Sequence, residues 1–159
     1  MAGVNPIPDG YPRVTPYLIV QGAAAAVDFY AGVFGATERM RMPGPDGTIG
    51  HCELELGDGL IMLADEHPEM NILGPRTIGG TPVIVSLYVE DVDGVFERAL
   101  QQGATSLRPP ETQFYGDRSG QFEDPFGHRW SVASHVEDVS PEEMERRAAE
   151  AAAAGGAGG

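Results

Sequence analysis

The sequence has a single cysteine, few basic residues and no long apolar run. Cys52 has no partner for an internal disulfide, and no stretch reaches the roughly 18 consecutive apolar residues that a membrane span needs. The first residues, MAGVNPIPDGYPR, lack the basic start and the apolar core of a secretory signal. We therefore expect a cytoplasmic protein that has no membrane partner.

Basic residues are outnumbered by acidic ones, with 10 Lys and Arg against 24 Asp and Glu and a formal net charge of −14. The field of that charge repels nucleic acid and anionic membranes, so we expect no nucleic-acid partner. It excludes no small substrate, because one arginine in a cleft reverses the local sign. With 159 residues, 42% of them hydrophobic, the chain predicts one domain or two small halves that share a core.

The first half of the chain alternates between the strand and helix periods. Residues 22–34 carry apolar side chains at three- and four-residue steps, which predicts a helix, and Gly35 stands where a left-handed C-cap is expected. In residues 48–56, Cys52 and Leu54 share one strand face and His51 and Glu53 the other. The pattern predicts a first module over 14–65, with strands at 14–21, 36–42, 48–56 and 60–64.

The second half repeats this order. Gly35-Ala36-Thr37 returns as Gly103-Ala104-Thr105, and Gly59 returns as Gly127, both 68 residues later. The second module covers 82–136, with a strand at 82–90, a helix at 91–102, a strand from 104 and a hairpin at 115–130. We predict an α+β fold of two βαβββ modules, each with a helix on one sheet face and a concave open face on the other.

The remaining segments carry no repeat. Residues 1–13 predict an irregular arm, and residues 66–81 a linker without periodicity. Ser140-Pro141-Glu142-Glu143 is a capping box that predicts a helix to about residue 152 within the C-terminal segment 137–159. We expect the glycine-rich end of that segment to be disordered.

The hairpin at 115–130 concentrates polar and aromatic residues beside a tight turn at Asp124-Pro125-Phe126-Gly127. Alternation places His128 and Trp130 on the helix-packed face, which favours a core tryptophan and a hydrogen-bonded histidine. Asp117 and Arg118 are neighbours in the sequence. Two interpretations remain open for them: an ion pair that braces the hairpin, or a polar rim that clamps a ligand.

Several stretches together resemble the vicinal oxygen chelate superfamily, the group of glyoxalases, bleomycin-resistance proteins and extradiol dioxygenases. The resemblance covers about 15–136 and is most specific for the PhnB-like branch. It is carried by TPYLIV, AVDFYAGVFGA, DGTIGHCELELGDG, LYVEDVDGVFERALQQGAT and YGDRSGQFEDPFGHRWSVASH. It implies paired βαβββ modules and a cavity on the concave side, but leaves the activity open because function varies widely within the group.

The resemblance also implies where a metal would be held. Metal-dependent members use one side chain from the first strand and one from the last strand of each module. The equivalent places fall on Thr15, Met62 (Leu63 if the register slips by one), Ile84 and Ser131. Apolar side chains do not bind divalent metal ions, and neutral hydroxyls bind them poorly unless imidazole or carboxylate ligands are also present. We therefore expect no metal and no cofactor.

If the implied metal places mark the face of the cavity, the alternation of the strands gives the residues that line it. Arg118, at the rim of the hairpin, is added to this lining. The wall suits a planar or amphipathic small molecule with an acceptor or anionic group. An alternative interpretation places Tyr17 and Tyr88 at a dimer seam. The predicted ligand-binding residues are Thr15, Tyr17, Met62, Ile84, Ser86, Tyr88, Arg118, Arg129 and Ser131.

The sequence thus favours a metal-independent small-molecule-binding protein, a homodimer that sequesters an antibiotic or a metabolite. The alternative is a lyase, isomerase or oxygenase. It would use either an atypical metal site built from His51, Glu53 and His128, or acid–base chemistry with His51 and Glu53 as the catalytic candidates. The simplest interpretation of His51, Glu53 and Glu55 remains a solvated strand face.

Overall fold

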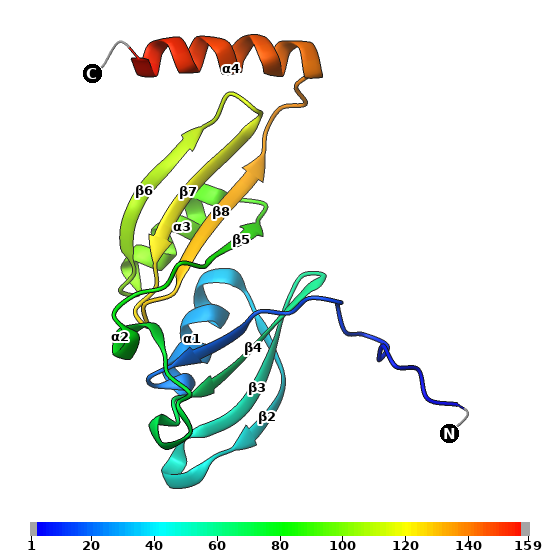
Figure 1. Ribbon diagram of the computed structural model, residues 1–159, viewed down its shortest axis with the longest axis vertical. Helices are drawn as coiled ribbons and strands as arrows, with labels where there is room; N and C mark the ends of the chain where they lie inside the picture. The colour runs from blue at the N-terminus through cyan, green and yellow to red at the C-terminus, as the bar shows by residue number, and fades with distance from the viewer. Residues whose placement is uncertain (1–2, 157–159) are drawn as a thin grey trace. The chain divides into compact units, whose positions relative to one another are not determined.

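Each half of the chain forms a four-stranded mixed sheet in the computed structural model, which describes residues 3–156 (Figure 1). Two compact units contain these sheets. The first unit consists of the described residues up to Val83 together with Asp124–His128, and the second of Ile84–Glu123 and the described residues from Arg129 onward. The start of the second module predicted at residue 82 lies close to this division. The sequence alone did not show that the turn at 124–128 belongs to the first unit.

The first sheet is built from residues 17–65 and has the strand order β1-β4-β3-β2. β1 runs parallel to β4, and the other neighbours are antiparallel. Its elements are β1 (Tyr17–Val20), α1 (Ala23–Phe34), β2 (Thr37–Pro43), β3 (Ile49–Leu56) and β4 (Gly59–Asp65), with a short 3-10 turn η1 (Pro45–Gly47) before β3. The connection that follows holds η2 (Pro68–Met70) and the one-turn helix α2 (Pro75–Ile78).

The second sheet repeats the topology with the order β5-β8-β7-β6 and a parallel β5–β8 pair. Its elements are β5 (Ile84–Tyr88), α3 (Val92–Gln101), β6 (Thr105–Thr112), β7 (Asp117–Glu123) and β8 (Arg129–His135), followed by α4 (Pro141–Gly156). The predicted α+β fold with two βαβββ modules is therefore confirmed.

Prolines set the limits of two strands. β1 starts at Tyr17 rather than at residue 14, because Pro16 has no amide hydrogen; its carbonyl still accepts from the Met62 amide at 2.9 Å. β6 continues through Pro109 and Pro110, beyond the predicted strand start. It is the outer strand of its sheet, where an absent donor is tolerated, and its register shifts between Arg108 and Glu111.

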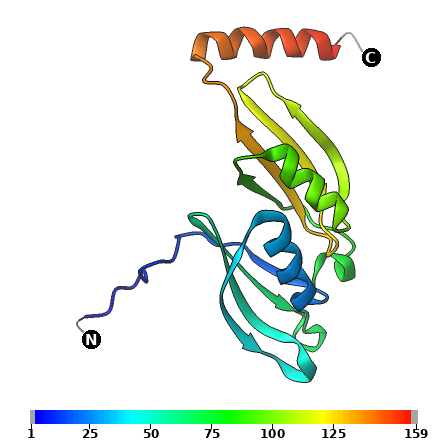
Figure 2. The same ribbon diagram turned by 180° about the vertical axis from the view of Figure 1, so that it is seen from behind.

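α1 covers one face of the first sheet. Figure 2 shows this helix in front of the strands, whereas Figure 1 shows the opposite, uncovered face. Asp65, at the end of β4, accepts hydrogen bonds from the Gly22 and Ala23 amides at 2.9 Å, so its carboxylate stands at the helix N-terminus. The buried residues between helix and sheet include Leu18, Val20, Ala26, Phe29, Tyr30, Val33, Cys52, Leu54 and Leu63.

α3 covers one face of the second sheet in the same way (Figure 2). Trp130 and Phe122 are fully buried, and the Phe122 ring meets the Phe96 ring of α3 edge to face, with centroids 6.0 Å apart. The Asp91 side chain caps the helix by accepting from the Gly94 amide at 3.1 Å. The core position predicted for Trp130 is confirmed.

The turn between β7 and β8 is held by one buried carboxylate. Asp124 accepts from the amides of Phe126 and His128 at 2.9 and 3.0 Å, and its other oxygen accepts from the Tyr30 hydroxyl of α1 at 2.5 Å. Gly127 has a φ of 94°, a left-handed conformation that side chains rarely adopt. The turn at 124–128 is thus packed within the first unit.

The ends of the chain differ in structure. Residues 3–16 contain no helix or strand, as predicted for the arm, while α4 extends to Gly156 and so includes part of the tail expected to be disordered; residues 157–159 lie outside the described range. The Ser140 hydroxyl accepts from the Glu143 amide at 3.2 Å, as the capping box predicts. Within residues 3–156, no helix combines the length and the apolar character that crossing a membrane requires.

Replacing the buried tryptophan tests this core. We expect Trp130→Ala to lower the free energy of unfolding by about 3–5 kcal/mol, because a large side chain at 0% exposure leaves a cavity. Urea unfolding followed by circular dichroism measures the change. Val14→Ala is the matched control, since Val14 is 84% exposed and its loss should matter by less than about 0.5 kcal/mol. Equal stability of Trp130→Ala and the wild type would contradict the core placement.

Candidate functional site

The uncovered face of the first sheet carries one continuous row of side chains. Tyr17 of β1 stands beside Met62 of β4, Met62 opposite Glu53 of β3, and Glu53 opposite Met40 of β2. Residues in register across strands share a face, so these four lie together on the side away from α1. His51 occupies the next position on this face of β3 and stands opposite Met42 of β2. Two ionisable groups therefore lie among methionines and a tyrosine.

A line of hydrogen bonds joins Tyr17, His51 and Glu53. The Tyr17 hydroxyl lies 2.8 Å from His51 Nδ1, and His51 Nε2 lies 2.9 Å from Glu53 Oε2. An ionised carboxylate only accepts, so Nε2 carries the hydrogen and Nδ1 of a neutral ring accepts from Tyr17. The sequence left open that Glu53 lies on a solvated strand face. That interpretation is wrong, because Glu53 is only 4% exposed.

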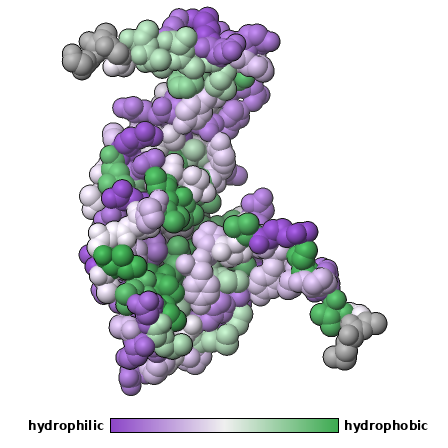
Figure 3. Space-filling model, viewed as in Figure 1, coloured by the Kyte–Doolittle hydropathy of each residue, from purple (hydrophilic) through white to green (hydrophobic). Residues whose placement is uncertain are grey.

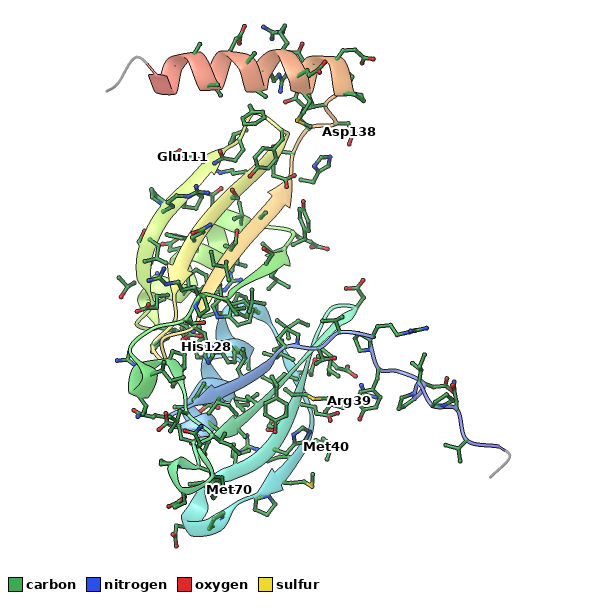
Figure 4. The ribbon with its side chains drawn as sticks, in the orientation of Figure 1. Arg39, Met40, Met70, Glu111, His128 and Asp138 are labelled. Atoms are coloured by element: carbon green, nitrogen blue, oxygen red, sulfur yellow. The ribbon has the colours of Figure 1, made fainter. Side chains whose placement is uncertain are left out.

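The N-terminal arm completes this cluster. The Tyr11 hydroxyl donates to the second oxygen of Glu53 at 2.9 Å, and the Arg39 guanidinium lies 4.4 Å from the centre of the Tyr11 ring. Arg39 also donates to the Gly10 carbonyl at 2.9 Å, and Figure 4 shows it on β2 next to the arm. Sequence reasoning missed Tyr11, since an irregular arm gives no periodicity from which to place a side chain.

The electrostatics of the cluster follow from these contacts. The hydrogen bond from His51, reinforced by the one from Tyr11, lowers the pKa of Glu53 even though burial raises it. Partial burial, with the Glu53 charge nearby, raises the pKa of Tyr17. At neutral pH the cluster thus holds an ionised carboxylate at its buried end and a protonated phenol at its exposed end.

The uncovered face of the second sheet carries most of the other predicted residues. Ile84 of β5 stands beside Arg129 of β8, and Ser86 beside Ser131, in parallel register. Gln121 of β7 stands opposite Ser131. Arg129 lies 3.6 Å from Glu123 as a surface ion pair. This face is richer in hydroxyl and amide groups than the methionine-lined face of the first sheet.

A second tyrosine–carboxylate–histidine cluster lies on this face. The Tyr88 hydroxyl donates to Asp117 Oδ2 at 2.6 Å, and His135 Nδ1 lies 2.8 Å from Asp117 Oδ1. His135 Nε2 lies 2.7 Å from Asp138 Oδ1, in the stretch after β8 where Figure 4 labels Asp138. Here the tyrosine meets the carboxylate directly, with no imidazole between them. Sequence reasoning did not identify His135 or Asp138 as part of a site.

These contacts shift the pKa of both charged partners. The hydrogen bond from Tyr88, then the one from His135, lowers the pKa of Asp117. The hydrogen bonds to Asp117 and Asp138 raise the pKa of His135. Ser119 of β7 points to the same face as Asp117, and its buried hydroxyl is the one side-chain polar atom within residues 3–156 that is buried without a hydrogen-bond partner.

Two predicted residues lie elsewhere. Arg118 alternates with Asp117, so it points to the helix side, where Nε and Nη2 each donate to Asp93 of α3 at 2.9 Å. Of the two interpretations left open for Asp117 and Arg118, an ion pair between them is therefore wrong, because adjacent residues of a strand face opposite ways. Thr15 precedes β1 and is half-buried.

The donor set does not fit a divalent ion. The residues at the places implied by the resemblance offer a thioether at Met62, an aliphatic chain at Ile84 and neutral hydroxyls at Thr15 and Ser131. Residues 3–156 contain no group of three or more His, Cys, Asp and Glu side chains that could hold a metal. His128 donates from Nε2 to the Ile19 carbonyl at 2.9 Å, whereas His51 bonds to Tyr17 and Glu53.

Comparison with known proteins agrees with the topology and the registers described above. A model of the Glyoxalase/Bleomycin resistance protein/Dioxygenase superfamily matches residues 11–132. The chain belongs to this superfamily. A mycobacterial relative, an uncharacterised protein of Mycobacterium bovis, is 44% identical over 137 residues, which cover 84% of this chain and 90% of that protein.

Three solved structures share the fold of this one. TioX from Micromonospora sp. ML1 is 29% identical with a TM-score of 0.62, over 79% of this chain and 99% of that one. Protein PA1353 from Pseudomonas aeruginosa is 25% identical with a TM-score of 0.64 over the same shares. A PhnB protein from Bacillus cereus, at 19% identity and a TM-score of 0.61 over 77% of this chain and 99% of that one, shows the fold alone.

This superfamily member also exposes apolar side chains between β4 and the start of β5. Ile78, Val83 and Ile84 are each more than one third exposed. Figure 3 shows hydrophobic residues, in green, over α2. Such surface is compatible with contact to a ligand or to a second chain.

The Asp117–His135 pair predicts a pH-dependent stability. Since the pKa of His135 is raised, its contribution is full below the ordinary value of 6.5 and is lost as the pH rises through the raised pKa. The contribution of Asp117 is present above 3.8 and is lost as the pH falls through its lowered pKa. We expect His135→Gln to destabilise the protein at about pH 5 and to have no effect near pH 9.

Thermal unfolding of His135→Gln and of the wild type across this range measures the difference. His67→Gln, which removes an exposed histidine near Glu69, is the matched control. A destabilisation that is the same at both ends of the range would show that His135 acts through packing rather than charge.

Proposed function

We propose that this protein binds a small organic molecule, without a metal, on the uncovered faces of its sheets. The observation that carries the proposal is the register row on the first sheet, where Tyr17, Met62 and Met40 present apolar surface on the side that α1 does not cover. The resemblance to the superfamily implies a cavity on this side of the sheets. The residues at the implied metal places have no donor set that fits an ion.

The chemistry of each face, taken by itself, indicates the kind of ligand group that it suits. On the first sheet, methionine side chains adapt to planar apolar groups, and Glu53 supplies a negative charge that its partners already neutralise in part. On the second sheet, Ser86, Ser131 and Arg129 offer hydroxyl donors and a guanidinium to an acceptor or anionic group. We propose sequestration of an antibiotic or a metabolite as the biological role.

We also propose that the protein is a homodimer. The exposed apolar residues Ile78, Val83 and Ile84 supply surface that an interface would bury. Size-exclusion chromatography with light scattering measures the mass directly. A mass of one chain, 16.9 kDa, at micromolar concentration would contradict the dimer.

A charge placed in the apolar row tests the first face. We expect Met62→Arg to weaken ligand binding by about tenfold or more. A guanidinium next to Tyr17 and Met40 removes apolar surface, and a ligand that covered it would have to displace the water that hydrates its charge. Native mass spectrometry of protein purified with EDTA reports the organic mass that co-purifies with each variant.

Leu100→Arg on α3 is the control, since Leu100 is also apolar and is 40% exposed but lies away from this row. The proposal predicts an organic ligand on the wild type and on Leu100→Arg and its loss from Met62→Arg. An equal amount of ligand on both variants would exclude the first face as the ligand site. Loss of ligand from the wild type on EDTA treatment would contradict metal-independent binding.

The guanidinium on the second face supports a separate prediction. We expect Arg129→Ala to weaken binding of the co-purified ligand while leaving the fold intact, because the Glu123 pair of Arg129 is exposed and contributes little stability. Arg98→Ala, on the exposed side of α3, is the matched control. Unchanged affinity by calorimetry would remove Arg129 from the site.

A further inference from the structure

Ligand binding alone does not account for the geometry of Tyr17, His51 and Glu53. Exposure falls along the line of hydrogen bonds, from 47% for Tyr17 to 19% and 5% for the side chains of His51 and Glu53. The hydroxyl proton of Tyr17 thus stands at the surface of the sheet, and the carboxylate that balances its transfer is buried beneath. A group that only held a ligand would not need an imidazole between phenol and carboxylate.

The hydrogen-bond roles in this line are determined by the chain itself. Glu53 accepts at both oxygens, from His51 and from Tyr11, so it orients the imidazole and selects the tautomer with hydrogen on Nε2. Nδ1 then faces the Tyr17 hydroxyl as a base. A hydroxyl, an imidazole and an orienting carboxylate in this sequence have the arrangement that activates a hydroxyl in acyl-transfer enzymes.

The surroundings favour an uncharged partner. Met40, Met42 and Met62 flank the ionisable groups on the same face. The charged groups that approach the cluster from neighbouring elements are Arg39 of β2, which pairs with Glu55 at 3.9 Å, and Glu55 itself. A neutral planar compound meets apolar side chains here, and a negative charge that develops on it would lie beside the imidazolium.

We propose that Tyr17, His51 and Glu53 form a metal-free acid–base relay that exchanges a proton with a neutral, planar carbonyl compound bound on the uncovered face of the first sheet. This inference rests on the proposed function, because it needs a ligand on that face. Tyr17 is the group that touches the compound, His51 receives or returns the proton, and Glu53 is a positioning residue. The activity is an isomerisation between keto and enol forms.

The step balances without a further reactant. The C–H bond next to the carbonyl breaks and its proton goes to Tyr17 Oη, while the hydroxyl proton of Tyr17 goes to His51 Nδ1. The electron pair of the C–H bond remains on the compound as an enolate, and the imidazolium is held by Glu53. Return of the proton to the enolate oxygen gives the enol, and its return to carbon gives the ketone.

The Tyr88–Asp117–His135 cluster lacks a feature of the Tyr17–His51–Glu53 cluster, namely an imidazole between the phenol and the carboxylate. Tyr88 and Tyr17 both begin on the first strand of a module and reach over the last strand, but Tyr88 donates directly to Asp117. The lowered pKa of Asp117 makes this carboxylate a weak base for a phenol, and no imidazole stands between Tyr88 and Asp117. The relay is therefore confined to the first sheet.

Hydrogen–deuterium exchange of 2-tetralone tests the relay. This neutral ketone has a planar aromatic ring and acidic hydrogens next to its carbonyl, and proton NMR in D2O with EDTA follows their replacement. We expect the full chain to accelerate exchange above the buffer rate and to lose about 100-fold of that acceleration in Tyr17→Phe and in His51→Gln. Tyr115→Phe and His67→Gln are matched controls outside the cluster, and thermal unfolding verifies that each variant is folded.

The role of Glu53 has its own readout. Nitrogen NMR of the His51 ring should show hydrogen on Nε2 in the wild type and a mixture of tautomers in Glu53→Gln, together with slower exchange of 2-tetralone. A purely structural role for Glu53 would leave the His51 tautomer unchanged in the folded variant and would remove Glu53 from the relay.

The outcomes separate this inference from the proposed function. Binding of 2-tetralone, seen as shifts of the Tyr17 and His51 resonances, without accelerated exchange would overturn the relay and leave ligand binding standing. Exchange that persists in Tyr17→Phe, or that EDTA abolishes, would also overturn the relay. Absence of any shift at a saturating concentration of 2-tetralone would count against both the relay and the apolar ligand face.

Discussion

One-sided burial is the constraint on which the structure depends. Each sheet is covered by a single helix on one face, so the strand period of two sends apolar residues such as Leu54 and Val132 toward the helix and leaves the alternate residues uncovered. A shift of one residue in register would exchange the two sets and expose the core. The uncovered set is therefore free to carry chemistry, and it holds both hydrogen-bonded clusters.

Within that set, buried polar groups are tolerated because they are hydrogen-bonded. Glu53 loses most of its water but gains donors from His51 and Tyr11, and Asp117 gains donors from Tyr88 and His135. Removing one donor from either carboxylate would leave a buried charge under-solvated. Ser119 is the contrast, since its buried hydroxyl lacks such a partner within the described residues.

Much of the fold followed from the sequence, because local pattern and tertiary structure agree. The duplicated Gly-Ala-Thr segments, the alternation in residues 48–56 and the capping at Ser140 each depend on nearest neighbours along the chain. The turn at 124–128 was different. Its membership of the first unit depends on a bond between Asp124 and Tyr30, 94 residues apart, which no local pattern records.

The site was predicted less completely for the same reason. Alternation put His51 and Glu53 on one face, but the bonds that join them to Tyr17 and Tyr11 are long-range. The pair of Arg118 with Asp93 on α3 is long-range as well. The account rests on open sheet faces that bind an organic ligand without an ion. Elemental analysis of protein purified without added metal tests this most directly: the account predicts far less than one divalent ion per chain, and one tightly held ion per chain would contradict it.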